Sequence, residues 1–105
     1  MEPEYRLKVT PAAEEDLDGI YLYISETLSA PTASQNLRAK IKKRFLSLCD
    51  NPYQCELSRN EILAKKGYRR AVVDNYVGLY LIDETKKRVI IARVFYGAMD
   101  YEKYI

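Results

Sequence analysis

The sequence contains no histidine. Histidine is the side chain whose ordinary pKa lies closest to neutral pH, so proton transfer by this chain must use tyrosine, lysine, arginine, aspartate or glutamate. The only cysteines are Cys49 and Cys55, which are too few to complete a structural zinc site without histidine. The sequence therefore predicts no metal site and no cofactor.

Two further absences concern location. No apolar run approaches the roughly 20 residues that span a bilayer, and the opening MEPEYR lacks the basic and apolar regions of a secretory signal. A disulfide between Cys49 and Cys55 is not expected in a reducing cytosol, so both are predicted to be free thiols. We therefore expect a cytoplasmic protein with no membrane partner.

The composition predicts a folded protein. The chain has 105 residues, 48% of them hydrophobic and 30% charged, which indicates a single globular domain over residues 1–105. Residues 1–30 carry seven acidic and two basic side chains, whereas residues 31–105 carry fifteen basic and eight acidic ones. This asymmetry predicts either a basic face or ordinary solvated helix faces.

The first half predicts one strand and two helices. Residues 4–9 alternate polar and apolar side chains, as a half-buried strand does. Thr10-Pro11 is typical of a helix start, and a proline at position 31 predicts the end of that helix near residues 29–30. A second helix is expected from residues 31–33 to Asn51-Pro52. The predicted core stripes are Ala13, Leu17, Ile20, Tyr21, Ile24 and Leu28 in the first helix, and Ala33, Leu37, Ile41, Phe45 and Leu48 in the second.

The second half predicts three strands. Residues 53–67 read as a long connection with a short turn around residues 57–63. Strands follow over residues 68–73, 76–82 and 87–96, with turns at Asp74-Asn75, where Asn75 tolerates positive φ, and at residues 83–86. The predicted fold is α+β, in the order β-α-α-β-β-β. A helical hairpin packs on one face of a mainly antiparallel four-stranded sheet, and the other face is open to a ligand or partner.

Basic and tyrosine side chains gather toward the end of the chain. The segment RVFYGAMDYEKYI supplies Arg93, Tyr96, Tyr101 and Tyr104, and residues 100–105 are expected to be a short helical turn or an extended tail. Arg69 and Arg70 lie on the first of the three strands, after Lys65 and Lys66. Arginine and tyrosine without acidic residues in the same strands favour a polyanionic or acidic partner.

The element order, together with YRRAVVDNYVGLYLIDE and RVFYGAMDYEKYI, is similar to that of the RelE/ParE family of bacterial toxins. The resemblance runs from VTPAAEEDL to the last residue. It implies a growth-inhibiting toxin of a type II toxin–antitoxin (plasmid stabilisation) module, neutralised by a cognate antitoxin. RelE-like members cut messenger RNA on the ribosome, whereas ParE-like members poison DNA gyrase and are not nucleases.

The resemblance also implies where a nuclease site would lie. RelE-like nucleases have basic residues on the first two strands of the terminal sheet, an arginine after the last strand and a tyrosine near the C-terminus. Arg69 and Tyr101 match that pattern. Val77 or Gly78, and residues 97–99 (Gly-Ala-Met), stand where such nucleases carry cations. The resemblance therefore favours slightly a ParE-like, gyrase-directed mechanism without RNA cleavage.

Two alternatives stay open. The first is a metal-independent endoribonuclease (an mRNA interferase) that uses Arg69, Arg93, Tyr96 and Tyr101. The second is a degenerate member that only binds its antitoxin. Lys65, Lys66, Arg70 and Tyr104 are candidates for binding RNA or a partner, and an antitoxin segment is expected to cover Arg69, Arg70 and Arg93.

Each of these residues also has a purely structural interpretation. Arg69 and Arg70 fit an outer strand face, Tyr96 fits a core or edge aromatic, and Tyr101 and Tyr104 fit packing of the tail. Lys42, Lys43 and Arg44 are read as a solvated helix face.

Overall fold

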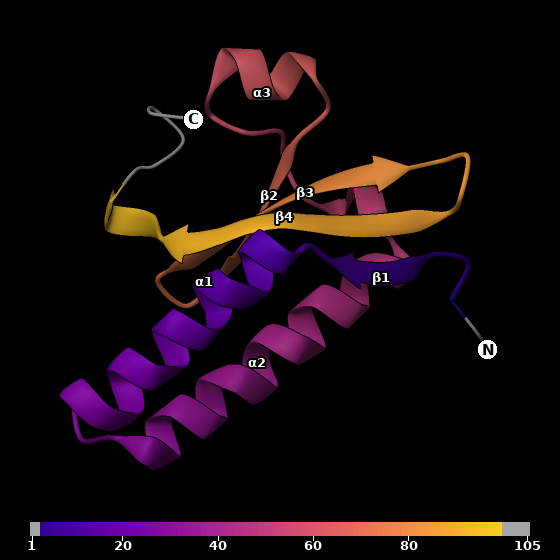
Figure 1. Ribbon diagram of the computed structural model, residues 1–105. Coiled ribbons are helices and arrows are strands. Elements are labelled where there is room, and N and C mark those ends of the chain that lie inside the picture. Colours follow the sequence, from indigo (N-terminus) through magenta and orange to yellow (C-terminus); the bar gives the residue numbers. More distant parts are fainter. Residues whose placement is uncertain (1–2, 100–105) are drawn as a thin grey trace.

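The computed structural model describes residues 3–99. In chain order the elements are β1 (Arg6–Val9), α1 (Pro11–Leu22), the π-helical turn η1 (Tyr23–Thr27), α2 (Pro31–Asp50), the 3₁₀ turn η2 (Pro52–Gln54), α3 (Glu61–Lys65), β2 (Arg69–Val73), β3 (Tyr76–Asp83), β4 (Arg88–Tyr96) and the 3₁₀ turn η3 (Gly97–Met99). Figure 1 shows α1 and α2 side by side on one face of the sheet and α3 on the other. The predicted α+β order is confirmed. The expected tail over residues 100–105 lies outside the described residues.

The helical hairpin starts as predicted. The Thr10 hydroxyl accepts a hydrogen bond from the N–H of Ala13 at 3.1 Å, and Pro11 is the first helical residue. The prediction of one regular stripe through Leu28 was wrong, because the α-helix ends at Leu22 and continues as a π-helical turn. A π turn is wider than an α turn, so later residues rotate away from the core, and Leu28 is 55% exposed.

The second helix occupies the predicted span and buries most of the predicted stripe. Leu37, Ile41, Phe45 and Leu48 are buried, but Ala33 is exposed and its neighbour Ser34 is buried instead. Ser34 donates its hydroxyl to the backbone oxygen of Tyr21 at 2.8 Å. That bond satisfies the buried hydroxyl and fastens α2 to α1.

The connection before the sheet is more ordered than the sequence predicts. Instead of a turn over residues 57–63, the chain forms α3, whose first turn is capped by the Asn60 side chain accepting from the N–H of Leu63 at 3.0 Å. Residues 56–58 run beside β2, where the Arg70 N–H donates to the Glu56 oxygen at 3.0 Å. The start of β2 is therefore covered on its outer edge.

The four strands lie in the order β1-β4-β3-β2. β1 pairs in parallel with β4, and the other two pairings are antiparallel, so the sheet is mainly antiparallel as predicted. The register between β3 and β4 shifts by one residue at Ala92, since Leu79 faces Arg93 whereas Tyr80 faces Ile91. In the β2–β3 hairpin, Asp74 rather than the expected Asn75 has positive φ, at 51°.

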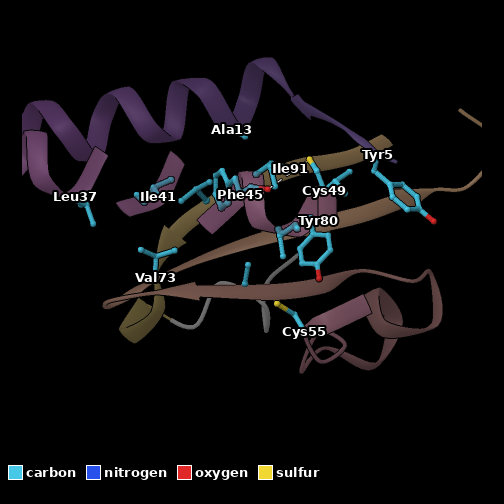
Figure 2. Packing of buried hydrophobic residues seen from close by; sticks show 14 of the residues in the cluster. Tyr5, Ala13, Leu37, Ile41, Phe45, Cys49, Cys55, Val73, Tyr80 and Ile91 are labelled. Carbon is cyan, nitrogen blue, oxygen red and sulfur yellow. Dashed lines mark hydrogen bonds between the residues drawn. The ribbon is translucent and has the colours of Figure 1, made fainter. Parts of the chain in front are cut away.

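The core lies between the hairpin and the sheet. Buried side chains of α2, among them Leu37, Ile41 and Phe45, form one cluster with side chains of the strands, such as Tyr80 and Ile91 (Figure 2). Phe45 packs directly onto the backbone of β3, because a Cβ placed on Gly78 would lie 2.9 Å from its ring. The absence of a side chain at Gly78 allows this close packing.

A second apolar cluster corrects the prediction of an open face. On the side of the sheet away from the hairpin, Leu63 of α3 and Tyr68 pack against Val77, Leu79 and Phe95. Val77 and Leu79 are only 2% and 1% exposed. The connection folds back because its apolar residues cover those of β3 and β4. This face is therefore covered near α3, whereas Val72 of β2, on the same face, is 47% exposed.

Candidate functional site

The predicted site residues do not converge on one surface. Arg69 is the strand partner of Tyr80 and shares its helix-covered face, whereas Arg70 is the partner of Leu79 on the opposite face. Consecutive strand residues point to opposite faces of a sheet. Tyr101 and Tyr104 lie outside the described residues, so their predicted roles stay predictions.

Arg93 is held by an acidic residue of α1. Its guanidinium donates to the two carboxylate oxygens of Asp16 at 2.7 and 3.0 Å, and the same carboxylate accepts the Val94 N–H at 3.0 Å. Beside it, the Thr10 hydroxyl donates to the Ala92 oxygen at 2.9 Å. Side chains of the α1 start therefore bind β4 where its pairing with β1 ends. The acidic partner of Arg93 belongs to a helix. The lack of acidic residues within the strands therefore did not predict whether this arginine is paired.

Arg70 is largely removed from solvent. It is 9% exposed, and its guanidinium lies 3.6 Å from the Glu56 carboxylate. A buried cation needs such compensation because desolvation disfavours its charge. Its position fits a structural role beside the connection.

Arg69 is also engaged by the connection. Its guanidinium donates to the Cys55 oxygen at 2.5 Å and lies 5.2 Å from the ring centroid of Tyr53. From α2, Arg44 donates to Gln54 at 2.6 Å and to the Cys55 sulfur at 3.1 Å. These arginines use donors within the protein that a phosphate-binding site would direct outward. Arg44 was read as a solvated helix residue, and the contacts with Gln54 and Cys55 correct that interpretation.

Lys65, Lys66 and Tyr96 remain at the surface. Both lysines are exposed at the end of α3. Tyr96 is 45% exposed, and its ring packs against that of Tyr76 with centroids 5.7 Å apart. Burial raises the pKa of Tyr76, with smaller contributions from Tyr96 and Tyr23. Tyr76 and Tyr96 thus form one pair of packed rings, which we call the tyrosine cluster.

The positions that would carry cations in a nuclease are occupied here by residues packed inside the fold. Val77 is buried under α3 and Gly78 under Phe45. Gly97 donates its N–H to the Asn75 oxygen at 2.7 Å, and a Cβ built on it would lie 3.2 Å from that oxygen. A longer side chain at Val77 or Gly78 has no free space in this arrangement.

A polar network at the opposite end of the sheet escaped the sequence interpretation. One carboxylate oxygen of Glu84 accepts from the hydroxyls of Tyr5 and Tyr53 at 2.7 and 2.6 Å, and the other accepts from Lys87 at 3.0 Å. The tyrosine hydrogen bonds are the main cause that lowers the pKa of Glu84 to about 2, followed by the bond from Lys87. The same bond to Glu84 raises the pKa of Tyr5. Since these residues are up to 79 positions apart, no local sequence pattern could predict the network.

Tyr80 joins the sheet to the connection before it. It is 0% exposed, and its hydroxyl donates to the Pro52 oxygen at 2.7 Å. Burial raises its pKa, and a hydrogen bond with Cys55 raises it further. A neutral, buried tyrosine of this kind anchors the connection and is a poor proton acceptor.

Within residues 3–99, no cluster of three or more cysteine, aspartate or glutamate side chains is arranged to hold a metal ion. None of the helices in the same span is long and apolar enough to cross a membrane.

Both the sequence and the fold of this chain are similar to those of known proteins. The family model for the ParE toxin of type II toxin-antitoxin system, parDE, matches residues 7–101. The chromosomal ParDE TA system from P. aeruginosa has a similar fold, with a TM-score of 0.72 and 21% identity over 90% of this chain and 98% of that one. The toxin-antitoxin complex RelBE2 from Mycobacterium tuberculosis is also similar, with a TM-score of 0.63 and 23% identity over 89% of this chain and 98% of that one. No curated protein matches the sequence. At these identities, the two solved structures show the shared fold alone.

Proposed function

This chain belongs to the family of ParE toxins of type II toxin–antitoxin systems, and we propose that it stops growth through contact with DNA gyrase, without cutting RNA. In this proposal the chain binds a protein target and does no chemistry on it. A cognate antitoxin neutralises it.

The observation that carries the proposal is the lack of outward cations where a nuclease site is expected. RNA cleavage by 2′-hydroxyl attack needs a proton acceptor and cations beside the phosphorane. Val77 and Gly78 are packed inside the fold, and Arg93 is bound to Asp16. Of the predicted catalytic residues that the structure describes, Arg69 and Arg93 bind groups of the chain itself, and Tyr96 is 45% exposed.

We propose the tyrosine cluster as the surface that contacts the target. Tyr96 is 45% exposed, and its ring packs against that of Tyr76. Tyrosine is enriched in the energetically important centres of protein interfaces, since one rigid ring offers both apolar area and a hydrogen bond. Such a cluster suits a protein partner without requiring a phosphate.

The proposed antitoxin partner rests on the relatives. The titles of the two similar structures describe a ParDE toxin–antitoxin system and a RelBE2 toxin–antitoxin complex. We infer a cognate antitoxin for this chain by analogy with them.

The experiment is a gyrase supercoiling and cleavage-complex assay with the purified chain. We expect inhibition that weakens about tenfold or more in a Tyr96→Ala variant, because interface aromatics often contribute 2 kcal/mol or more. Tyr53→Ala is the control, since Tyr53 is similarly exposed at 54% but lies in the Glu84 network. Equal inhibition by both variants would remove the tyrosine cluster from the mechanism.

Translating ribosomes provide the opposing assay. Codon-dependent cleavage of messenger RNA by the chain, abolished by Tyr96→Phe, would replace the gyrase proposal with the nuclease one. If expression of the chain leaves growth unchanged and neither assay responds, the chain is a member that only binds its antitoxin.

A further inference from the structure

The sheet face away from the helical hairpin is covered along only part of its length. α3 packs over Val77, Leu79 and Phe95, which are buried. Farther along the same face, Leu81 of β3 and its strand partner Ile90 of β4 are only half-buried. The part of this face that lies beside β1 is therefore at the surface.

Two cations of β1 lie on this part of the face. Leu7 and Val9 pack against the core cluster on the hairpin side, so Arg6 and Lys8, which alternate with them, point to the opposite face. Both are exposed, and neither forms an ion pair within residues 3–99. They lie about 7 Å apart along the strand, since two rises separate them. Their charges are therefore available to an anion from outside the chain.

The strand beside β1 adds a third cation. Arg88 is the direct strand partner of Arg6, and like charges opposite one another destabilise a sheet. One oxygen of Asp83 accepts from the Arg88 guanidinium at 3.3 Å, but the other accepts from the Lys86 N–H at 3.1 Å. The Nε atom of Arg88 is buried with no hydrogen-bond partner among the described residues. This row of cations is therefore short of both negative charge and acceptor atoms.

Two lysines border the same area from the end of α3. A Cβ built on Gly67 would lie 3.9 Å from the Leu81 side chain, so the residues that end α3 lie beside the half-buried pair Leu81 and Ile90. Lys65 and Lys66 directly precede Gly67 and are exposed. The cations around this half-buried pair form a surface that we call the basic face: Arg6, Lys8, Lys65, Lys66 and Arg88.

The arrangement of the basic face favours a chain of phosphates as its ligand. Its cations are spread over an open surface, which matches a regular array of charges better than one small anion. Two of them are arginines, whose forked donors suit phosphate oxygens. Arg88 begins β4 and Tyr96 ends it, so the basic face and the tyrosine cluster are about 26 Å apart along the strand. One molecule can therefore contact a protein at one end and DNA at the other.

We propose that the basic face binds phosphates of the DNA backbone, and that this DNA is the segment held by gyrase; the second part rests on the proposed function. Arg6 and Arg88 share one phosphate, which relieves their repulsion and supplies the missing acceptors, and Lys8 contacts the next. Lys65 and Lys66 add attraction from the other side of the face. Contacts with phosphates carry no sequence information, so binding is independent of base sequence.

The test is an anisotropy titration of a short fluorescent DNA duplex of mixed sequence at several salt concentrations. Arg6→Gln/Lys8→Gln is expected to weaken binding about tenfold and to lower the salt slope by about two, since each phosphate contact contributes about 0.9. Lys42→Gln/Lys43→Gln is the matched control, because it removes the same charge from an exposed face of α2. It should leave the slope unchanged and the dissociation constant within about twofold. Equal changes in both variants would overturn the proposal.

A second measurement uses the unaltered chain. The duplex should shift the amide resonances of β1 and of residues 88–90 more than those of α2. Larger shifts in α2 would place the DNA elsewhere and overturn the proposal. Tighter binding of a single-stranded RNA of the same length, or of a polyglutamate peptide of equal charge, would reject DNA as the ligand. Equal shifts with inorganic phosphate alone would do the same.

The titration contains no gyrase, so its outcome is independent of the target assay. Duplex binding at the basic face without any effect on gyrase would reject the proposed target and support the site. Gyrase inhibition that is equal for Arg6→Gln/Lys8→Gln and the unaltered chain, with no duplex binding by either, would reject the site and leave the proposed target standing.

Discussion

Asp16 accepts two hydrogen bonds from the guanidinium of Arg93, at 2.7 and 3.0 Å, although 77 positions separate the two residues. The pair is asymmetric. The side chain of Asp16 is 18% exposed and that of Arg93 is 54% exposed, and the same carboxylate also accepts the backbone N–H of Val94. The Asp16 carboxylate therefore satisfies a backbone N–H of β4 as well as the Arg93 guanidinium.

This asymmetry predicts unequal costs for the two truncations. Asp16→Ala should lower the free energy of unfolding by about 1–3 kcal/mol, because it leaves a partly buried backbone N–H without its acceptor. Arg93→Ala should cost about 0–1 kcal/mol, as for an exposed ion pair. Urea denaturation of both variants measures the difference. A larger loss for Arg93→Ala would contradict this prediction, because Asp16→Ala removes the ion pair together with the strand contact.

The contact between Gly78 and Phe45 predicts a steric effect. Gly78→Ala places a methyl group 2.9 Å from the Phe45 ring, and overpacking of this kind costs about 1–3 kcal/mol. Phe45→Leu should recover part of the loss when combined with Gly78→Ala, which a double-mutant cycle detects. Gly19→Ala is the matched control, because its Cβ meets nothing within 4 Å. In a helix that change should stabilise by about 0.5–1 kcal/mol.

Glu84 predicts a pH dependence of stability. Its folded-state pKa is about 2, below the ordinary value of about 4.3 for glutamate. Hydrogen bonds to the charged form therefore stabilise the fold above pH of about 4, and this contribution is lost as the pH falls toward 2. Over that range the unfolded chain binds a proton that the folded chain does not.

Glu84→Gln isolates this contribution. The variant should be less stable than the unaltered chain at pH 6, and the difference should shrink at pH of about 3. Urea midpoints at both pH values test this. A difference that stays constant with pH would mean that the charge of Glu84 contributes nothing and that only its position in the network matters.

The hydrogen bond from the Tyr80 hydroxyl should stabilise the connection against the sheet. Tyr80→Phe removes the 2.7 Å bond to the Pro52 oxygen and should cost about 1–2 kcal/mol, since the buried carbonyl loses its donor. Amide exchange should accelerate most in residues 52–58. Uniform acceleration across the sheet would instead indicate a general loss of stability.

Local patterns predicted the elements well because their causes are local. Thr10 and Pro11 set the start of α1, and Pro52 follows the end of α2. The π-helical turn was not predictable, since the stripe through Ile24 continues smoothly in sequence to Leu28. α3 was missed because its five residues, starting at Glu61, are too short to show helical periodicity.

The candidate site was harder to predict than the fold. The sequence predicted that Arg69, Arg70 and Arg93 share one basic surface. Their binding partners Cys55, Glu56 and Asp16 lie on other segments of the chain. Arg6 and Lys8 were visible as the polar half of a strand pattern. Their place on a strand at the edge of the sheet is shown only by the tertiary arrangement.

The binding of β4 by Thr10 and Asp16 has a kinetic consequence. The first strand and the first helix find their sheet partners only in residues 88–94, so neither can dock until the ribosome has released that segment. Long-range closure of this kind slows folding. The sheet is therefore completed only after nearly the whole chain has been made, because its first strand waits for its last one.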